Sequence, residues 1–342
     1  MEPHQAGIGR VTAAIIAIAA MLPYLTLKIV WLSGNPIGIT DPAMMNDPTM
    51  TALNGATFGM AAVGAVLALA FTMPWGMRLP AWLVLLPIWV GTGLLSLIVL
   101  SVPVSLIIEG AQVFPDGGPI EQWVYLTVYA GFIGQGVGLT AAFALYARDR
   151  WPHLFAKDLY GTAFRPFHTM IAWGVAVFAV PIGATYLYWA FGGTAGLARE
   201  LVEATNISGS IQMGVKGVLA WAAAAGFALM VRGRAREAMV AAWLGGGTLF
   251  AWGFYSTVIT VLKPPLTAGV TFSTAVPDLL EVLSMLTGLA VALAGAFLLV
   301  ERSGSRSVVE RSGGWGVVQP AQDPLEGEQR EHDRQPADRS HH

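Results

Sequence analysis

Eight long apolar stretches constrain the fold of this chain more than any other feature. Each holds roughly 20 mainly apolar residues, enough to cross the hydrocarbon core of a bilayer, which is about 30 Å thick. Each must also be helical, because lipid offers no hydrogen-bond partner to an open backbone. The sequence therefore predicts an all-α fold, a polytopic transmembrane helical bundle whose eight spans cover residues 11–32, 52–73, 80–104, 123–146, 167–190, 211–231, 239–262 and 279–300.

The composition agrees with this prediction. Hydrophobic residues make up 55% of the 342-residue chain and charged residues only 12%, whereas a soluble domain carries about 25% charged residues. Cysteine is absent, which excludes disulfides, thiol nucleophiles and Cys-ligated metal or iron–sulfur sites. The first apolar run is too long for the core of a signal peptide, so we expect it to remain as a span.

The distribution of Lys and Arg predicts the orientation of the spans. If the N-terminus is cytoplasmic, fifteen Lys and Arg residues fall in cytoplasmic segments, and only Arg199 and Lys263 fall in the outer loops. This is the positive-inside pattern of membrane proteins. We therefore expect a multi-pass protein of the cell membrane with both termini cytoplasmic.

Residue matches at a constant spacing indicate an internal duplication. Pro23, Trp31, Gly34 and Gly38 at the end of the first span each match the same residue type 158 positions later, and Ala-Trp-Leu at 81–83 recurs at 242–244. Four spans per copy is an even number, so the two copies would share one orientation about an axis along the membrane normal. We expect a tandem 4+4 parallel repeat.

The expected domains follow from this repeat. They are a first four-helix membrane repeat over residues 1–158, a second over residues 159–302, and a C-terminal tail over residues 303–342. The tail is rich in Gly, Ser, Pro and charged residues, and such a composition cannot bury enough apolar surface to fold. We therefore expect a disordered cytoplasmic tail.

Small residues favour close contact between spans. Gly55 and Gly59 form one small-xxx-small pair, Gly134 and Gly138 form another, and three glycines at 245–247 lie inside the seventh span. We interpret all of these as helix-packing positions. Gln135, near the middle of the fourth span, is expected to form an interhelical hydrogen bond. 

Ionisable side chains inside spans are candidates for a functional site, because they are costly in lipid. Lys28 and Lys216 each lie about one turn from the outer end of a span, and Asp278 and Glu281 share one helix face at the start of the last span. We expect these four residues to form a ligand-binding site in an outward-facing polar vestibule between the repeats. The alternative is that both lysines snorkel to the outer interface and belong to no site.

Other chemistries lack their residues. The sequence contains no Walker motif, no GxSxG elbow and no HExxH motif. The excess of acidic residues in the outer loops would attract cations, but it is also the complement of the basic inner segments, which is the interpretation we favour. We predict no catalytic residues, no metal, no cofactor and no nucleic-acid partner.

One segment carries a resemblance. Residues Trp189 to Gly196, preceded by Tyr186 and Tyr188, resemble a recurrent piece of uncharacterised multi-pass integral membrane proteins of actinobacteria, and Tyr24 to Gly38 resembles a degenerate copy of it. The resemblance covers a short piece of each half. It implies a lineage, and it carries no established activity.

Three functional hypotheses follow from these observations. The leading one is a transporter-like or small-ligand-binding membrane protein whose site contains the two lysines and the two acids. The second is a non-catalytic accessory or scaffold subunit, acting as a homo- or hetero-oligomer, which predicts a small-residue face left exposed to the lipid bilayer. The third is an intramembrane lipid-modifying enzyme, which predicts polar groups that converge on one point.

Overall fold

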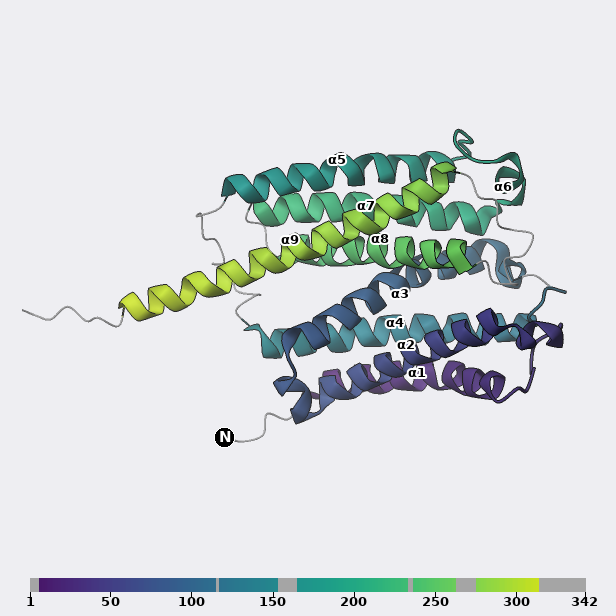
Figure 1. Cartoon of the computed structure of the whole chain (residues 1–342). Coiled ribbons are helices and arrows are strands. Elements are labelled where there is room, and N and C mark those ends of the chain that lie inside the picture. Colours follow the sequence, from purple (N-terminus) through teal and green to yellow (C-terminus); the bar gives the residue numbers. More distant parts are fainter. Residues whose placement is uncertain (1–5, 115–116, 153–164, 233–235, 263–274, 314–342) are drawn as a thin grey trace, which may run out of the picture. The chain divides into compact units, whose positions relative to one another are not determined.

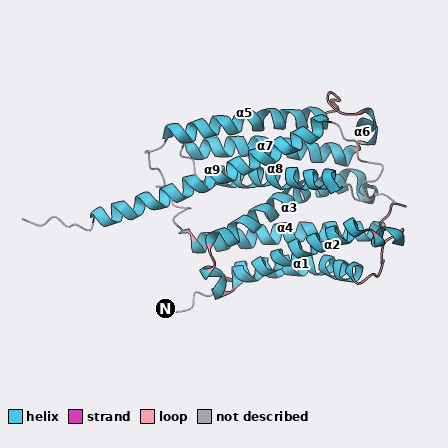
Figure 2. Ribbon diagram, viewed as in Figure 1, coloured by secondary structure: helices cyan, strands magenta, loops and turns pink. Residues whose placement is uncertain are grey.

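Every predicted span lies in a helix of the computed structural model, which describes residues 6–114, 117–152, 165–232, 236–262 and 275–313. A short helix, α6 (Arg199–Ala204), and three 3-10 turns, η1 (Pro42–Asn46), η2 (Pro74–Arg78) and η3 (Gly110–Val113), lie in the connections. The long helices are α1 (Ile8–Leu32), α2 (Pro48–Thr72), α3 (Ala81–Glu109), α4 (Gln122–Arg150), α5 (Arg165–Ala190), α7 (Ile207–Val231), α8 (Arg236–Leu262) and α9 (Ala275–Gly313) (Figure 1). Figure 2 shows that helices dominate the described residues.

Within the described residues, seven helices are long and apolar enough to cross a membrane: α1, α2, α3, α4, α5, α7 and α9. This make-up fits an integral, multi-pass membrane protein. The predicted span at 239–262 is helical as α8, but α8 is not one of the seven. Its hydropathy is lowered by the three glycines at 245–247 and by polar and aromatic residues near them. Eight membrane crossings therefore remain a prediction.

The chain divides into two compact units, Met1–Leu299 and Val300–His342. The backbone of α9 is helical through Gly313, so the predicted disordered tail does not begin at residue 303. Residues 314–342 of the predicted tail lie outside the described part of the chain.

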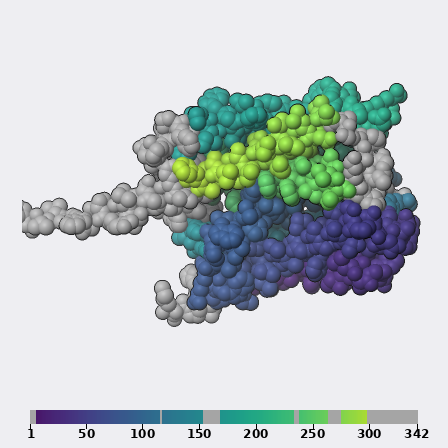
Figure 3. All heavy atoms as spheres, in the orientation of Figure 1, coloured from purple at the N-terminus to yellow at the C-terminus, as the bar shows by residue number. Residues whose placement is uncertain are grey.

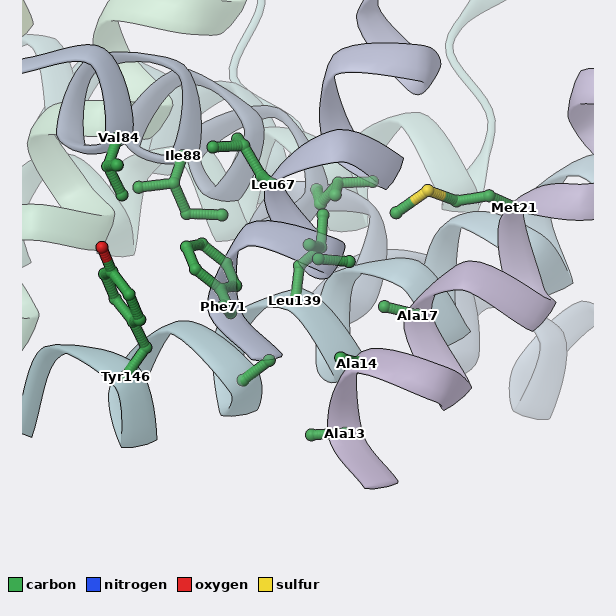
Figure 4. Packing of buried hydrophobic residues seen from close by; sticks show 13 residues of the cluster. Ala13, Ala14, Ala17, Met21, Leu67, Phe71, Val84, Ile88, Leu139 and Tyr146 are labelled. Atoms are coloured by element: carbon green, nitrogen blue, oxygen red, sulfur yellow. The ribbon is translucent and has the colours of Figure 1, made fainter. Parts of the chain in front are cut away.

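Helices α1 to α4 pack around one apolar core, which includes Met21, Phe71, Leu139 and Tyr146 (Figure 4). The alanines of α1 let α4 approach closely. A Cβ atom added at Gly138 would lie 2.7 Å from the backbone nitrogen of Ala17, so only glycine fits there. The prediction that this glycine packs between helices is confirmed.

The other predicted glycine pair behaves differently. A Cβ atom added at Gly55 or Gly59 would have nothing within 4 Å. This face of α2 therefore packs against nothing in the described residues, and the packing role predicted for the pair within this chain is wrong. Gln135 also departs from its prediction: its side chain is buried, but its Oε1 accepts no hydrogen bond from the described residues.

The long helices form two sets, α1 to α4 and α5 to α9. Helices α3 and α8 form the seam where the two sets meet. A Cβ atom added at Gly93 would lie 2.3 Å from the carbonyl carbon of Gly247, so the two backbones touch. The Trp89 indole donates to the Trp243 carbonyl at 3.2 Å, and the hydroxyls of Ser96 and Thr248 are 2.7 Å apart. Figure 3 shows the purple-to-blue helices and the teal-to-green helices as two blocks on this face.

The hydrogen bonds across the seam also give the direction of the two helices. The Trp252 indole donates to the Leu94 carbonyl at 3.1 Å. Bonded partners therefore keep a nearly constant difference in residue number, from 151 to 158, along the seam. A constant difference means that the residue numbers rise together, so α3 and α8 run parallel rather than antiparallel.

Candidate functional site

An ion pair inside the bundle is the centre of the candidate site. The Nζ atom of Lys216 on α7 lies 2.6 Å from Oε1 of Glu281 on α9, and the two side chains are only 16% and 14% exposed. Taking two charges out of water is costly, and a single unpaired partner would be worse. The pair therefore links α7 to α9. Separating the two charges is unfavourable unless each finds a new polar partner.

The pair lies deeper than the sequence suggested. Helix α7 begins at Ile207, four residues before the predicted start, so Lys216 is about 14 Å along the helix at 1.5 Å per residue. Glu281 is about 9 Å from the start of α9 on the same basis. Lys216 is therefore nine residues from the start of its helix, farther than the one turn expected from the start of the predicted apolar run.

Aromatic and hydroxyl groups enclose the pair. The ammonium of Lys216 lies 5.1 Å from the ring centre of Tyr186 on α5 and 5.7 Å from that of Trp252 on α8. The hydroxyl of Tyr186 lies close enough to the side chains of Glu281 and Ser284 to interact with them electrostatically. Aromatic faces attract an ammonium group, and more strongly where water is excluded. Four helices thus hold one cation, one carboxylate and one phenol together.

Lys28 has different partners from Lys216. Its Nζ donates to Oδ1 of Asn54 on α2 at 2.6 Å, and both residues are buried. The ammonium lies 5.2 Å from the ring centre of Tyr24 and 4.8 Å from that of Trp31. Within the described residues no carboxylate lies within 4 Å of it. The lysine points into the bundle and does not snorkel outward.

Aromatic residues connect the surroundings of the two lysines. Tyr255 on α8 lies close enough to Tyr24 on α1 to interact with it electrostatically, and also to Tyr129 on α4. The ring centre of Tyr255 is 5.5 Å from that of Trp252, which contacts Lys216. The segment of α8 that carries Trp252 and Tyr255 therefore lies between the two lysine environments.

The structure unites part of the predicted site. Lys216 and Glu281 meet directly, while Lys28 meets an amide instead of an acid. Asp278 is half-buried on α9, three residues before Glu281, and its membership of the site remains a prediction. The residues missed were Asn54, Tyr186 and Trp252. Asn54 is the only side-chain amide in its apolar run, which was the one available signal.

Several charged residues serve as structural partners. Asp47 caps α2, because its carboxylate accepts from the backbone nitrogens of Thr49 and Met50. At the other end of the bundle, Arg10 of α1 pairs with Asp149 of α4 at 3.0 Å. Arg150 donates to the carbonyls of Gly76 and Leu79 and so holds η2 against α4. These residues explain part of the charge pattern without a ligand.

The turns after α1 and α5 have the same conformation. Gly34 and Gly192 have φ of 87° and 88°, and both donate to a tryptophan carbonyl at 3.0 Å. The Trp31 indole donates to the Ile37 carbonyl and the Trp189 indole to the Ala195 carbonyl, both at 2.9 Å. Each of these partners is 158 residues from its counterpart, which is the spacing of the sequence matches.

Comparison with known proteins adds no relative. A scan against protein-family models and searches of curated proteins and of solved structures found no match to this chain. The likeness to actinobacterial membrane proteins therefore remains a prediction. Within the described residues, no group of three or more His, Cys, Asp and Glu side chains gathers where it could hold a metal ion.

Proposed function

We propose that this chain is a transporter-like or small-ligand-binding membrane protein whose ligand competes for the Lys216–Glu281 ion pair. The observation that carries the proposal is the position of that pair, which lies inside two helices apolar enough to cross a membrane. Ionisable residues at such positions are rare and usually mark a pathway or a binding site.

The surroundings of the pair support a binding role. A purely structural pair needs only its two charges, but here a phenol lies near the carboxylate and two aromatic rings lie near the ammonium. These groups would offer new partners to Glu281 and Lys216 if a ligand separated them. Asp278 and Lys28 complete the proposed site, the first on the same helix and the second across α8.

The proposal includes the architecture around the site. We infer that the two sets of four helices are copies, so that α8 is an eighth span. The ion pair and its aromatic neighbours belong to the second set, and of the four proposed site residues only Lys28 belongs to the first. The identical turns at a spacing of 158 and the parallel α3–α8 seam support the duplication. The cluster of Arg10, Arg148 and Arg150 at one end supports a cytoplasmic location of both termini.

Thermal unfolding of the purified protein in detergent tests the proposal. A panel of amino acids, short carboxylates and small amines is added separately to the wild-type chain and to a Lys216→Met, Glu281→Gln double variant. Replacing both charges by uncharged groups of similar size is tolerated far better than removing one, so the double variant should fold. We expect at least one compound to raise the melting temperature of the wild type and not that of the double variant.

A charge exchange separates binding from structure. The Lys216→Glu, Glu281→Lys variant keeps an ion pair between α7 and α9 but moves each charge to the other helix. We expect it to unfold near the wild-type temperature and to lose the response to the compound. If no compound shifts the wild type, or if every shift is the same in the double variant, the ligand site at this pair is refuted.

One observation favours the second candidate function, a non-catalytic accessory or scaffold subunit. Gly55 and Gly59 leave a small-residue face of α2 that nothing in the described residues covers, and such faces let another transmembrane helix approach closely. Cross-linking in native-like nanodiscs tests this candidate. It predicts oligomers or a co-purified subunit that disappear in Gly55→Leu, Gly59→Leu; equal cross-linking in both chains would refute it.

A further inference from the structure

Lys28 has no opposite charge to balance it in the described residues. Lys28 is 8% exposed, and the one side chain among the described residues to which its ammonium donates a hydrogen bond is the neutral Asn54, which is 4% exposed. Burying an ammonium is costly unless it is paired and hydrogen-bonded. Lys216 also lies near two aromatic rings, but it has Glu281 as a charged partner. The environment of Lys28 therefore contains an ammonium group, as that of Lys216 does, but no carboxylate partner among the described residues.

Two hydrogen-bond donors, the ammonium of Lys28 and the amide NH₂ of Asn54, lie together, which suits the binding of an oxyanion. Asn54 uses Oδ1 to accept from Lys28, and the described residues give its Nδ2 no acceptor. An ammonium and an amide NH₂ from neighbouring helices can each donate to one oxygen of a carboxylate, and charge-assisted bonds of this kind are the strong ones. Tyr24 lies on the same helix as Lys28, one turn away, and its ring centre is 5.2 Å from the ammonium.

The charge and the depth narrow the class of anion. One ammonium balances one negative charge, whereas a phosphate monoester carries about −1.5 to −2 at neutral pH. Lys28 is four residues from the end of α1 and Asn54 is six residues from the start of α2. Both therefore lie within about 9 Å of the same end of the bundle.

We propose that Lys28 and Asn54 bind the carboxylate of the ligand, so that the substrate class is a small monocarboxylate or a molecule that carries one. The proposal rests on the proposed function, because it treats Lys28 as part of the same site. It assigns Lys28 the anionic group and leaves Lys216 and Glu281 to the rest of the ligand. The single unbalanced ammonium is the contact that selects an acid over a neutral analogue.

Lysine-selective NMR tests this directly, because the chain has only four lysines, Lys28, Lys157, Lys216 and Lys263. The protein is labelled with ¹⁵Nζ and ¹³Cε lysine, placed in phosphatidylcholine nanodiscs, and titrated with sodium acetate at constant ionic strength against sodium sulfate. Lys28→Met assigns the signal. We expect a saturable acetate shift of the Lys28 signal that sulfate does not produce.

An isosteric variant gives the matched control. Asn54→Asp would supply the missing negative charge from within the chain, so it should keep the fold and abolish the acetate response of Lys28. If Asn54→Asp responds like the wild type, or if the wild-type Lys28 signal does not move, the proposal is overturned. A shift that appears only when phosphatidylglycerol replaces phosphatidylcholine, without acetate, would assign the anion to a lipid headgroup and would also overturn it.

The same titration separates this proposal from the proposed function. The Lys216→Met, Glu281→Gln variant keeps Lys28 and Asn54, so its Lys28 signal should still respond to acetate. If it does, while no compound stabilises the wild type through the ion pair, the carboxylate contact stands and the ion-pair site fails. If acetate does not shift the Lys28 signal while a compound stabilises the wild type through the ion pair, the ion-pair site stands and the carboxylate contact fails.

Discussion

The seam between α3 and α8 yields a sharp prediction for Gly93→Ala. The new Cβ atom would lie 2.3 Å from the carbonyl carbon and oxygen of Gly247, and ordinary van der Waals contact begins near 3.4 Å. The two backbones must therefore separate by about 1 Å, because the clash is with backbone and no side chain can rotate away. Overpacking of this kind costs about 1–3 kcal/mol.

The separation also lengthens the hydrogen bonds that cross the seam. Ser96–Thr248 at 2.7 Å and Trp252–Leu94 at 3.1 Å would both exceed the ordinary range of donor–acceptor distances. Hydrogen bonds between membrane helices contribute about 0.6 kcal/mol each, and alanine recovers about 0.5–1 kcal/mol over glycine inside a helix. We expect Gly93→Ala to lower the free energy of unfolding by about 1–4 kcal/mol.

Gly91 supplies the control, because it lies on the same helix and an added Cβ atom would have nothing within 4 Å. Gly91→Ala should leave stability unchanged or raise it by up to about 1 kcal/mol. The assay is reversible unfolding in detergent micelles, followed by tryptophan fluorescence and circular dichroism. If Gly93→Ala unfolds within about 0.5 kcal/mol of Gly91→Ala, the close contact between α3 and α8 is wrong.

Three further predictions concern single side chains. Asp47→Ala should lower stability by about 1 kcal/mol through loss of the α2 cap, measured by thermal unfolding; an unchanged midpoint would contradict the cap. Tyr146→Phe should cost about 1–2 kcal/mol, because the buried hydroxyl donates to the Gly76 carbonyl at 2.7 Å and accepts from Arg150, and hydrogen exchange of η2 should rise with it. Gly34→Ala and Gly192→Ala should each cost about 1–2 kcal/mol from positive φ with no steric clash; unequal losses would argue against equivalent turns.

The sequence was sufficient for the helices because their length and apolarity are local properties. All eight predicted spans are helical, and most boundaries lie within four residues of the prediction. Asp47 and Asn206 extend α2 and α7 beyond their apolar runs, because both side chains cap the first turn. Such caps move the start of a helix without changing its hydropathy, which is why Lys216 was placed too close to the end.

The partners of each charged residue could not be read in the same way. Lys216 and Glu281 were expected in one layer, and the structure joins them. Lys28 was expected among the same acids, but it contacts Asn54, which no charge pattern distinguishes. The choice depends on which helix lies beside α1, and that is a tertiary property. The glycine pair of α2 fails for the same reason, since a small-residue motif does not say whether its partner is in the same chain.

The parallel seam between α3 and α8 has a consequence for the ancestry of the chain. In a symmetric dimer, the same helix of each copy can meet at the two-fold axis. If that axis runs along the helices, the two copies of the helix are parallel. On the proposed duplication, a four-helix forerunner would have paired with itself through its third helix, and α3 and α8 would descend from that one helix. The two lysines would not descend from one residue, because the 158-residue spacing pairs Lys28 with Tyr186 and Lys216 with Phe58.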